Sequence, residues 1–141
     1  MIEYVGSLEQ LALENTFFRQ VIFTGTHSQL VLMCLAPGEK AGDEVHQDVD
    51  QFFRVEKGEA IFVFDEMSEQ TVRHGDAVVV PAGTYHNVIN SSKTEPLKLY
   101  TIYSPPVHPE GTIHRTKADA EAREVMEERD DQPILSVSTT Q

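Results

Sequence analysis

Short apolar runs alternate with turn-forming residues along most of the chain, and this pattern predicts β-strands. Residues 28–36 are too uniformly apolar for a half-exposed strand, so we expect this strand to be buried on both faces. The other runs are rich in β-branched and aromatic residues and end at Gly, Pro, Asn, Asp or Ser. Strands are expected over residues 17–24, 28–36, 60–64, 70–73, 77–80, 84–89 and 97–103, with another that begins near Gln51. Seven or eight strands without intervening helices exclude a parallel α/β sheet and fit an all-β jelly roll.

Helical signals occur only near the two ends of the chain. Residues 7–10 read Ser-Leu-Glu-Gln, which has the form of a capping box and predicts a short helical turn over residues 8–13. Residues 116–119 can cap a second helix, whose apolar side chains fall on one narrow face. Beyond residue 130 no period is evident. We therefore expect a barrel with an N-terminal arm over residues 1–115, followed by a charged helix and a loose tail over residues 116–141.

The composition is that of one small globular domain. The chain has 141 residues, of which 40% are hydrophobic, and it has a single cysteine. Cys34 has no partner and lies in an apolar run, so we expect a packed thiol in a reducing, cytoplasmic compartment. The first residues lack the basic and apolar regions of a secretory signal, and the apolar runs are too short to span a bilayer. No membrane partner is expected.

The formal net charge of -12 argues against nucleic acid as a partner. Phosphate backbones are bound chiefly by clustered Lys and Arg, and the sequence has no such cluster. A phosphorylated ligand would also need a cation in its pocket. The basic residues that could serve are scattered among the strands: Arg19, Arg54, Arg73 and Lys98. Arg54 has the parity of an outward-facing residue, so a sugar phosphate has no specific support.

The most informative spacing lies in residues 75–90. A glycine, a proline, a second glycine, a histidine and an asparagine recur at fixed intervals in it, as Gly75, Pro81, Gly83, His86 and Asn90. Two strands meet here at a tight turn, and alternation directs His86 toward the inside of the sheet. The spacing resembles the second motif of the cupin family at every position. A single inward histidine needs partners elsewhere to form a site.

Residues 37–59 resemble the first cupin motif with two departures. Six residues separate Gly58 from Gln51, which stands where the family usually has Glu. Four more residues separate Gln51 from His46, and Glu44 lies two positions before His46, where it replaces a His. The rival register, which pairs His46 with Asp48, would put a phenylalanine where an oxygen ligand is needed. The resemblance implies a double-stranded β-helix and a metal site formed by Glu44, His46, Gln51 and His86.

The two departures retain the charge of the site. Three neutral histidines and one Glu contribute one negative charge, and so do Glu44, His46, Gln51 and His86. Two imidazoles and a carboxylate are the ingredients of the facial triad of non-haem iron, and they also suit manganese or zinc. We expect one divalent ion, with donor atoms at about 2.0 to 2.3 Å. The alternative is a barrel whose polar pocket residues bond one another and water.

The resemblance leaves the reaction open, because cupins perform many kinds of chemistry. Within the family the chain most resembles small single-domain barrels often described as mannose-6-phosphate isomerase-like. An isomerase would use the metal to polarise an oxygen while Glu44 or His46 moves a proton, if that residue is not a ligand. An iron dioxygenase and a non-catalytic module that binds a small polar ligand are the alternatives.

Three further expectations concern residues outside these motifs. His108 and His114 have no evident third ligand, so surface histidines are favoured over a second metal site. Phe53, Phe62 and Phe64 are expected in the core, and Tyr103 and His108 could line the mouth of the pocket. The strand over residues 17–24 is expected to present an open edge, so we expect a homodimer formed by one sheet and the N-terminal segment. Like charges should keep the helix over residues 117–129 outside that interface.

Overall fold

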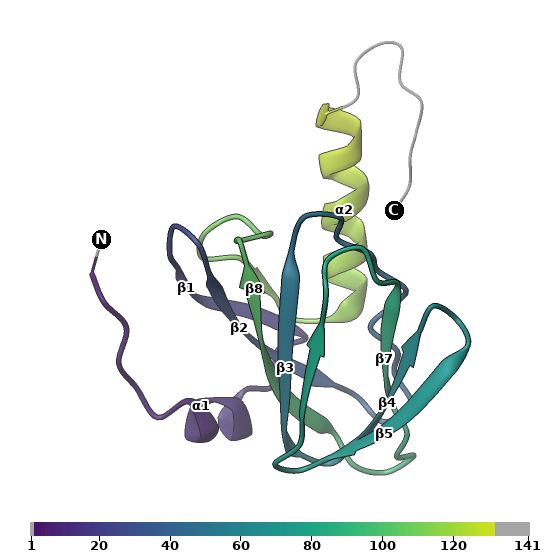
Figure 1. The fold of residues 1–141 in the computed structure, drawn as a ribbon. Helices are drawn as coiled ribbons and strands as arrows, with labels where there is room; N and C mark the ends of the chain where they lie inside the picture. The colour runs from purple at the N-terminus through teal and green to yellow at the C-terminus, as the bar shows by residue number, and fades with distance from the viewer. Residues whose placement is uncertain (1, 132–141) are drawn as a thin grey trace.

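The computed structural model describes residues 2–131 and shows two antiparallel β-sheets that face each other (Figure 1). The larger sheet has the strand order β6-β3-β8-β2-β1-β9, and the smaller has the order β5-β4-β7. The elements are α1 (Leu8–Glu14), β1 (Arg19–Thr24), β2 (Gln29–Leu35), β3 (Asp50–Lys57), β4 (Glu59–Phe64), β5 (Ser68–Arg73), β6 (Ala77–Val80), β7 (His86–Asn90), β8 (Leu97–Ser104), β9 (Ile113–His114) and α2 (Lys117–Asp131). The predicted jelly-roll architecture is therefore confirmed.

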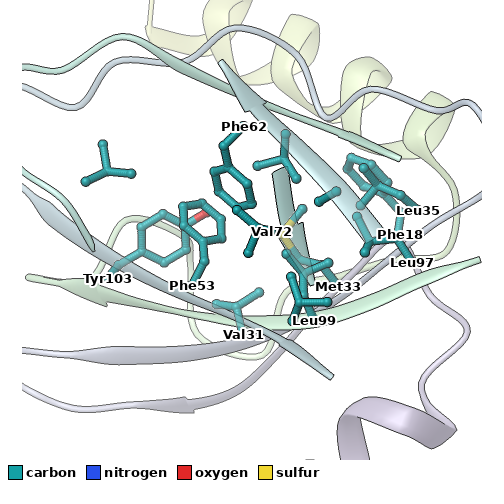
Figure 2. Close-up of a cluster of buried hydrophobic side chains, with 14 of the residues drawn as sticks. Phe18, Val31, Met33, Leu35, Phe53, Phe62, Val72, Leu97, Leu99 and Tyr103 are labelled. Atoms are coloured by element: carbon teal, nitrogen blue, oxygen red, sulfur yellow. The ribbon is translucent and has the colours of Figure 1, made fainter. Parts of the chain in front are cut away.

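Alternating side chains give each sheet one inner face. Along β3, Gln51, Phe53 and Val55 are buried while Arg54 is turned outward. The core between the sheets is formed mainly by aliphatic and aromatic residues, several of which are drawn in Figure 2. Phe62 of β4 is fully buried, and its ring centroid lies 5.0 Å from that of Phe53. Aromatic side chains from both sheets thus meet at the centre of the barrel, where Phe53 also contacts His86.

The predicted helices and strands are observed, with shifts at their ends, but the predicted capping hydrogen bond at the first helix is absent. The strand predicted over residues 28–36 is β2, which is central in the larger sheet and mostly buried, as expected. The predicted N-terminal turn is α1, but the Ser7 side chain makes no capping hydrogen bond. The second predicted helix is α2, and the predicted loose tail falls largely on residues 132–141, outside the described residues. No helix within residues 2–131 is long and apolar enough to cross a membrane.

The segment that follows β8 covers the edge of β1. The Phe18 N–H donates to the Arg115 carbonyl oxygen at 3.1 Å, and the Val21 N–H donates to that of Thr112 at 2.8 Å. Between these bonds, β9 pairs with β1 so that His114 lies opposite Arg19. The expectation of an open edge over residues 17–24 is therefore wrong. Its cause is a long-range pairing, because the covering residues lie about ninety positions further along the chain.

Candidate functional site

The four residues implied by the two motifs lie around one end of the space between the sheets. His86 begins β7 and Gln51 lies near the start of β3, whereas Glu44 and His46 lie in the connection between β2 and β3. This connection runs antiparallel to β7, and the backbones of Glu44 and His86 exchange two N–H···O bonds of 2.9 Å. We call Glu44, His46, Gln51 and His86 the four-residue site. Its members come from both sheets and from the connection between two strands of the larger sheet.

A glycine turn holds the two motifs against each other. Gly83 has a φ of 86°, a conformation that L side chains rarely adopt, and its N–H donates to the His46 carbonyl oxygen at 2.8 Å. The neighbouring Ala82 N–H donates to the Asp50 carboxylate at 2.9 Å. The turn before β7 therefore fixes the backbone of His46. This contact brings the two sequence motifs together in the fold.

Three polar atoms of the site are buried without a hydrogen-bond partner. They are His46 Nε2, His86 Nε2 and Gln51 Oε1. An unpaired buried polar atom costs about 1 to 3 kcal/mol, so three of them in one place indicate a position built for a bound species. The imidazole rings of His46 and His86 lie 6.1 Å apart between centroids. Two imidazole nitrogens and an amide oxygen are donors that a divalent transition metal accepts, so these residues fit such an ion.

Neighbouring groups set the orientation of two of these donors. His86 Nδ1 lies 3.2 Å from the Thr84 carbonyl oxygen, which can only accept, so the ring hydrogen is on Nδ1 and Nε2 keeps its lone pair. Gln51 Nε2 donates to Thr101 Oγ1 at 2.9 Å, and this bond leaves Oε1 as the free end of the amide. Such outer partners are typical of metal ligands because they fix the ring or amide in the binding orientation.

The carboxylate of Glu44 is the least constrained member of the site. Its Oε1 lies 3.9 Å from His46 Nε2, and its side chain is 29% exposed. The donor atoms of Glu44, His46 and His86 do not all lie within 4.8 Å of one another. One or more of these side chains would therefore have to move for all three to share an ion, or Glu44 would act beside an ion held by the others.

Aromatic side chains and a further histidine surround the site. The Tyr103 ring stands edge-on to His46, with centroids 5.7 Å apart, and Phe53 packs against His86 at 5.8 Å. The Tyr103 hydroxyl lies 3.3 Å from His108 Nε2. Burial raises the pKa of Tyr103, so its hydroxyl keeps its proton at neutral pH. Tyr103 therefore presents a neutral hydroxyl next to the histidines.

Burial keeps the imidazoles of His46 and His108 neutral. It lowers the pKa of His46, with Glu44 opposing and His86 and Arg19 adding to the effect. It also lowers the pKa of His108, to about 3, reinforced by the charge of Arg19. Neutral imidazole is the form that binds metal. At neutral pH, His46 is thus in the protonation state that a metal ligand needs.

The expectation that both His108 and His114 lie on the surface is wrong for His114, which is buried, while His108 is half-buried. The backbone N–H groups of Val107 and His108 both donate to Gln29 Oε1, which anchors this segment to β2. His114 is buried because β9 pairs with β1, and its Nδ1 accepts a hydrogen bond of 3.2 Å from Arg19 Nη1. These contacts of His108 and His114 depend on pairing with residues far away in the sequence, so no local sequence pattern marks them.

A second group of metal-ligating side chains lies outside the barrel interior. One potential ligand atom from each of Glu9, Glu56 and His74 falls within 4.8 Å of the others, the single group of this kind among residues 2–131. Glu9 and His74 are exposed, and the buried Glu56 carboxylate already accepts a bond of 3.2 Å from Arg54 Nε. The arginine charge opposes a cation there. The four-residue site, with its unpaired buried donors, is the better candidate.

Two sheets that enclose a polar site at one end define a double-stranded β-helix. The cupin domain model matches residues 31–103, which include all four residues of the site. The chain therefore belongs to the cupin family.

The chain is also similar to other proteins over most of its length. The chain is 47% identical over 126 residues to YrkC of Bacillus subtilis (strain 168), covering 86% of this chain and 67% of YrkC. It is 47% identical over 112 residues to L612 of Acanthamoeba polyphaga mimivirus, covering 78% of this chain and 70% of L612. The crystal structure of BH2720 from Bacillus halodurans is similar with a TM-score of 0.83 and 41% identity, covering 86% of this chain and 95% of that one.

Proposed function

We propose that this protein is a metal-dependent cupin that binds and transforms a small polar molecule. The observation that carries the proposal is the set of three unpaired buried donors, His46 Nε2, His86 Nε2 and Gln51 Oε1, at one end of the barrel. Glu44 supplies the nearest carboxylate, so the charge of the site matches that of the usual cupin ligands. Iron, manganese and zinc fit this donor set. When bound, the ion would polarise an oxygen of the ligand.

Two reaction classes differ in what Glu44 does. In a sugar isomerase-like enzyme, of the kind named mannose-6-phosphate isomerase-like, Glu44 moves a proton between adjacent carbons and is not a ligand. In a non-haem iron dioxygenase, Glu44 completes a triad with His46 and His86. Glu44 Oε1 lies 3.9 Å from His46 Nε2, near enough for either role. A non-catalytic binding module would use the same pocket without turnover.

The variant Glu44→Gln separates these roles. If Glu44 is a proton-transfer base, we expect the variant to keep its metal and lose activity by about 100-fold or more, because general acid–base groups contribute about 10² to 10⁴. Elemental analysis and a screen of aldose and ketose pairs measure the two quantities. Loss of the metal from the variant would instead identify Glu44 as a ligand, and oxygen consumption by the ferrous protein would then be the assay. Glu69→Gln, on an exposed strand, is the control.

We also propose that the protein forms a homodimer through the larger sheet and the N-terminal arm. Residues 2–7 precede α1 without regular structure (Figure 1), and Ile2 and Val5 are 83% and 93% exposed. Exposed apolar residues on such an arm favour packing against another copy. We expect light scattering to return twice the mass of one chain, and we expect Val5→Asp to weaken the dimer. Met67→Asp, equally exposed at the β4–β5 turn, is the control.

One chain mass at micromolar concentration would exclude the dimer. Deleting residues 117–141 should leave it intact, and a monomeric product of that deletion would show that the interface lies elsewhere. The prediction of a cytoplasmic protein without nucleic-acid partners rests on the single cysteine and the net charge of -12.

A further inference from the structure

Arg19 is a buried charge without a counterion among the described side chains. Its residue is 3% exposed, and among the residues that the structure describes no carboxylate forms an ion pair with it. Its Nη1 donates to the neutral acceptor His114 Nδ1 at 3.2 Å, and its Nε is buried without any hydrogen-bond partner. Arginine is almost never fully buried unless it is paired, because removing its charge from water is costly. The position of Arg19 therefore requires an explanation.

A cavity lies in front of this arginine. Its volume is about 290 Å³, and its lining includes Arg19, His108, Thr112, His114, Arg123 and Glu124. Arg123 and Glu124 are exposed residues of α2, and their charges are opposite in sign. Arg19 is the buried charged residue in the lining of the cavity. A buried, fork-shaped donor with an unused N–H is suited to bind a carboxylate in a bidentate manner.

The cavity adjoins the four-residue site. His108 lines the cavity, its ring centroid lies 5.2 Å from that of Tyr103, and Tyr103 in turn packs against His46. A molecule held at Arg19 therefore lies beside the side chains of His108 and Tyr103, which separate it from His46.

We propose that the ligand is a small carboxylic acid whose carboxylate is held by Arg19, in the cavity beside the four-residue site. This assignment deepens the proposed function and rests on it only in taking the four-residue site as the place of the reaction. A single buried positive charge matches a carboxylate better than a phosphate dianion. The cavity volume fits an acid of a few carbon atoms.

The test measures carboxylate binding and metal content separately. Calorimetric titrations use malonate, its uncharged isostere malonamide, and inorganic phosphate at constant ionic strength, with and without added Mn²⁺. We expect malonate to bind the wild-type protein, malonamide not to bind, and Arg19→Met to weaken malonate binding at least tenfold. Arg19→Lys, which keeps the charge but not the fork, should be intermediate. Arg73→Met removes an exposed arginine of β5 and should bind malonate normally.

Thermal unfolding adds a readout that a merely structural arginine would not give. Malonate should raise the melting temperature of the wild type and not that of Arg19→Met, whereas the ligand-free variant should be no less stable, because it loses an unpaired buried charge. Equal malonate binding by the wild type and Arg19→Met overturns the inference. So does a wild type that binds Mn²⁺ but not malonate, or one that prefers phosphate. Malonate binding by a protein that takes up no metal supports Arg19 as the carboxylate site and refutes the proposed metal function instead.

Discussion

Replacing His86 with alanine is expected to remove most of the bound metal. His86 Nε2 is buried and has no hydrogen-bond partner, and the Thr84 carbonyl holds the ring hydrogen on Nδ1, so that Nε2 keeps its lone pair for a metal. Loss of an outer partner alone typically costs about 10 to 100-fold in metal affinity, and loss of the ligand itself should exceed this. Elemental analysis of protein purified without added metal, followed by titration with Mn²⁺ or Zn²⁺, measures the effect.

Two matched variants make this result specific. His74→Ala removes the histidine of the outer Glu9, Glu56 and His74 group and should leave the metal content unchanged. Gln51→Glu should raise affinity, because it adds a negative charge where the family usually has one. Metal loss from His74→Ala together with retention in His86→Ala would move the site to the outer group. Equal metal content in His86→Ala, Gln51→Glu and the wild type would refute the four-residue site.

The largest expected effect on stability is that of Phe62→Ala. Phe62 is fully buried in β4 and packs edge-on against Phe53 at 5.0 Å, at the centre of the contact between the two sheets (Figure 2). Truncating such a residue leaves a cavity and typically costs about 3 to 5 kcal/mol. Urea denaturation should show a lower midpoint with a similar slope. Met67→Ala, at an 86% exposed position on the turn after β4, is the control and should change stability by less than about 0.5 kcal/mol.

A change below about 1 kcal/mol in Phe62→Ala would show that the site collapses around the missing ring. Because Phe53 also packs against His86, the same variant should loosen the histidine and lower metal affinity. This secondary loss should be smaller than that caused by His86→Ala.

Local patterns in the sequence predicted the strands and the placement of His86, because alternation and the turn at Pro81 and Gly83 act over a few residues. The approach of His46 to this turn followed from the motif resemblance. The surroundings of Arg19 could not be predicted in the same way. They depend on the pairing of β9 with β1, and no local period marks two residues of Ile and His as a strand. A cation alone in an apolar strand, as Arg19 is in residues 17–24, was the available signal.

The division of the site between the two sheets links ligand binding to the mechanical integrity of the barrel. Gln51 belongs to the larger sheet and His86 to the smaller, so an ion held by both would cross-link the two sheets. Each tenfold rise in free ion above the dissociation constant would then add about 1.4 kcal/mol to the free energy of unfolding. The lifetime of the folded protein in a cell would accordingly follow the local supply of the metal, independently of any reaction that the protein catalyses.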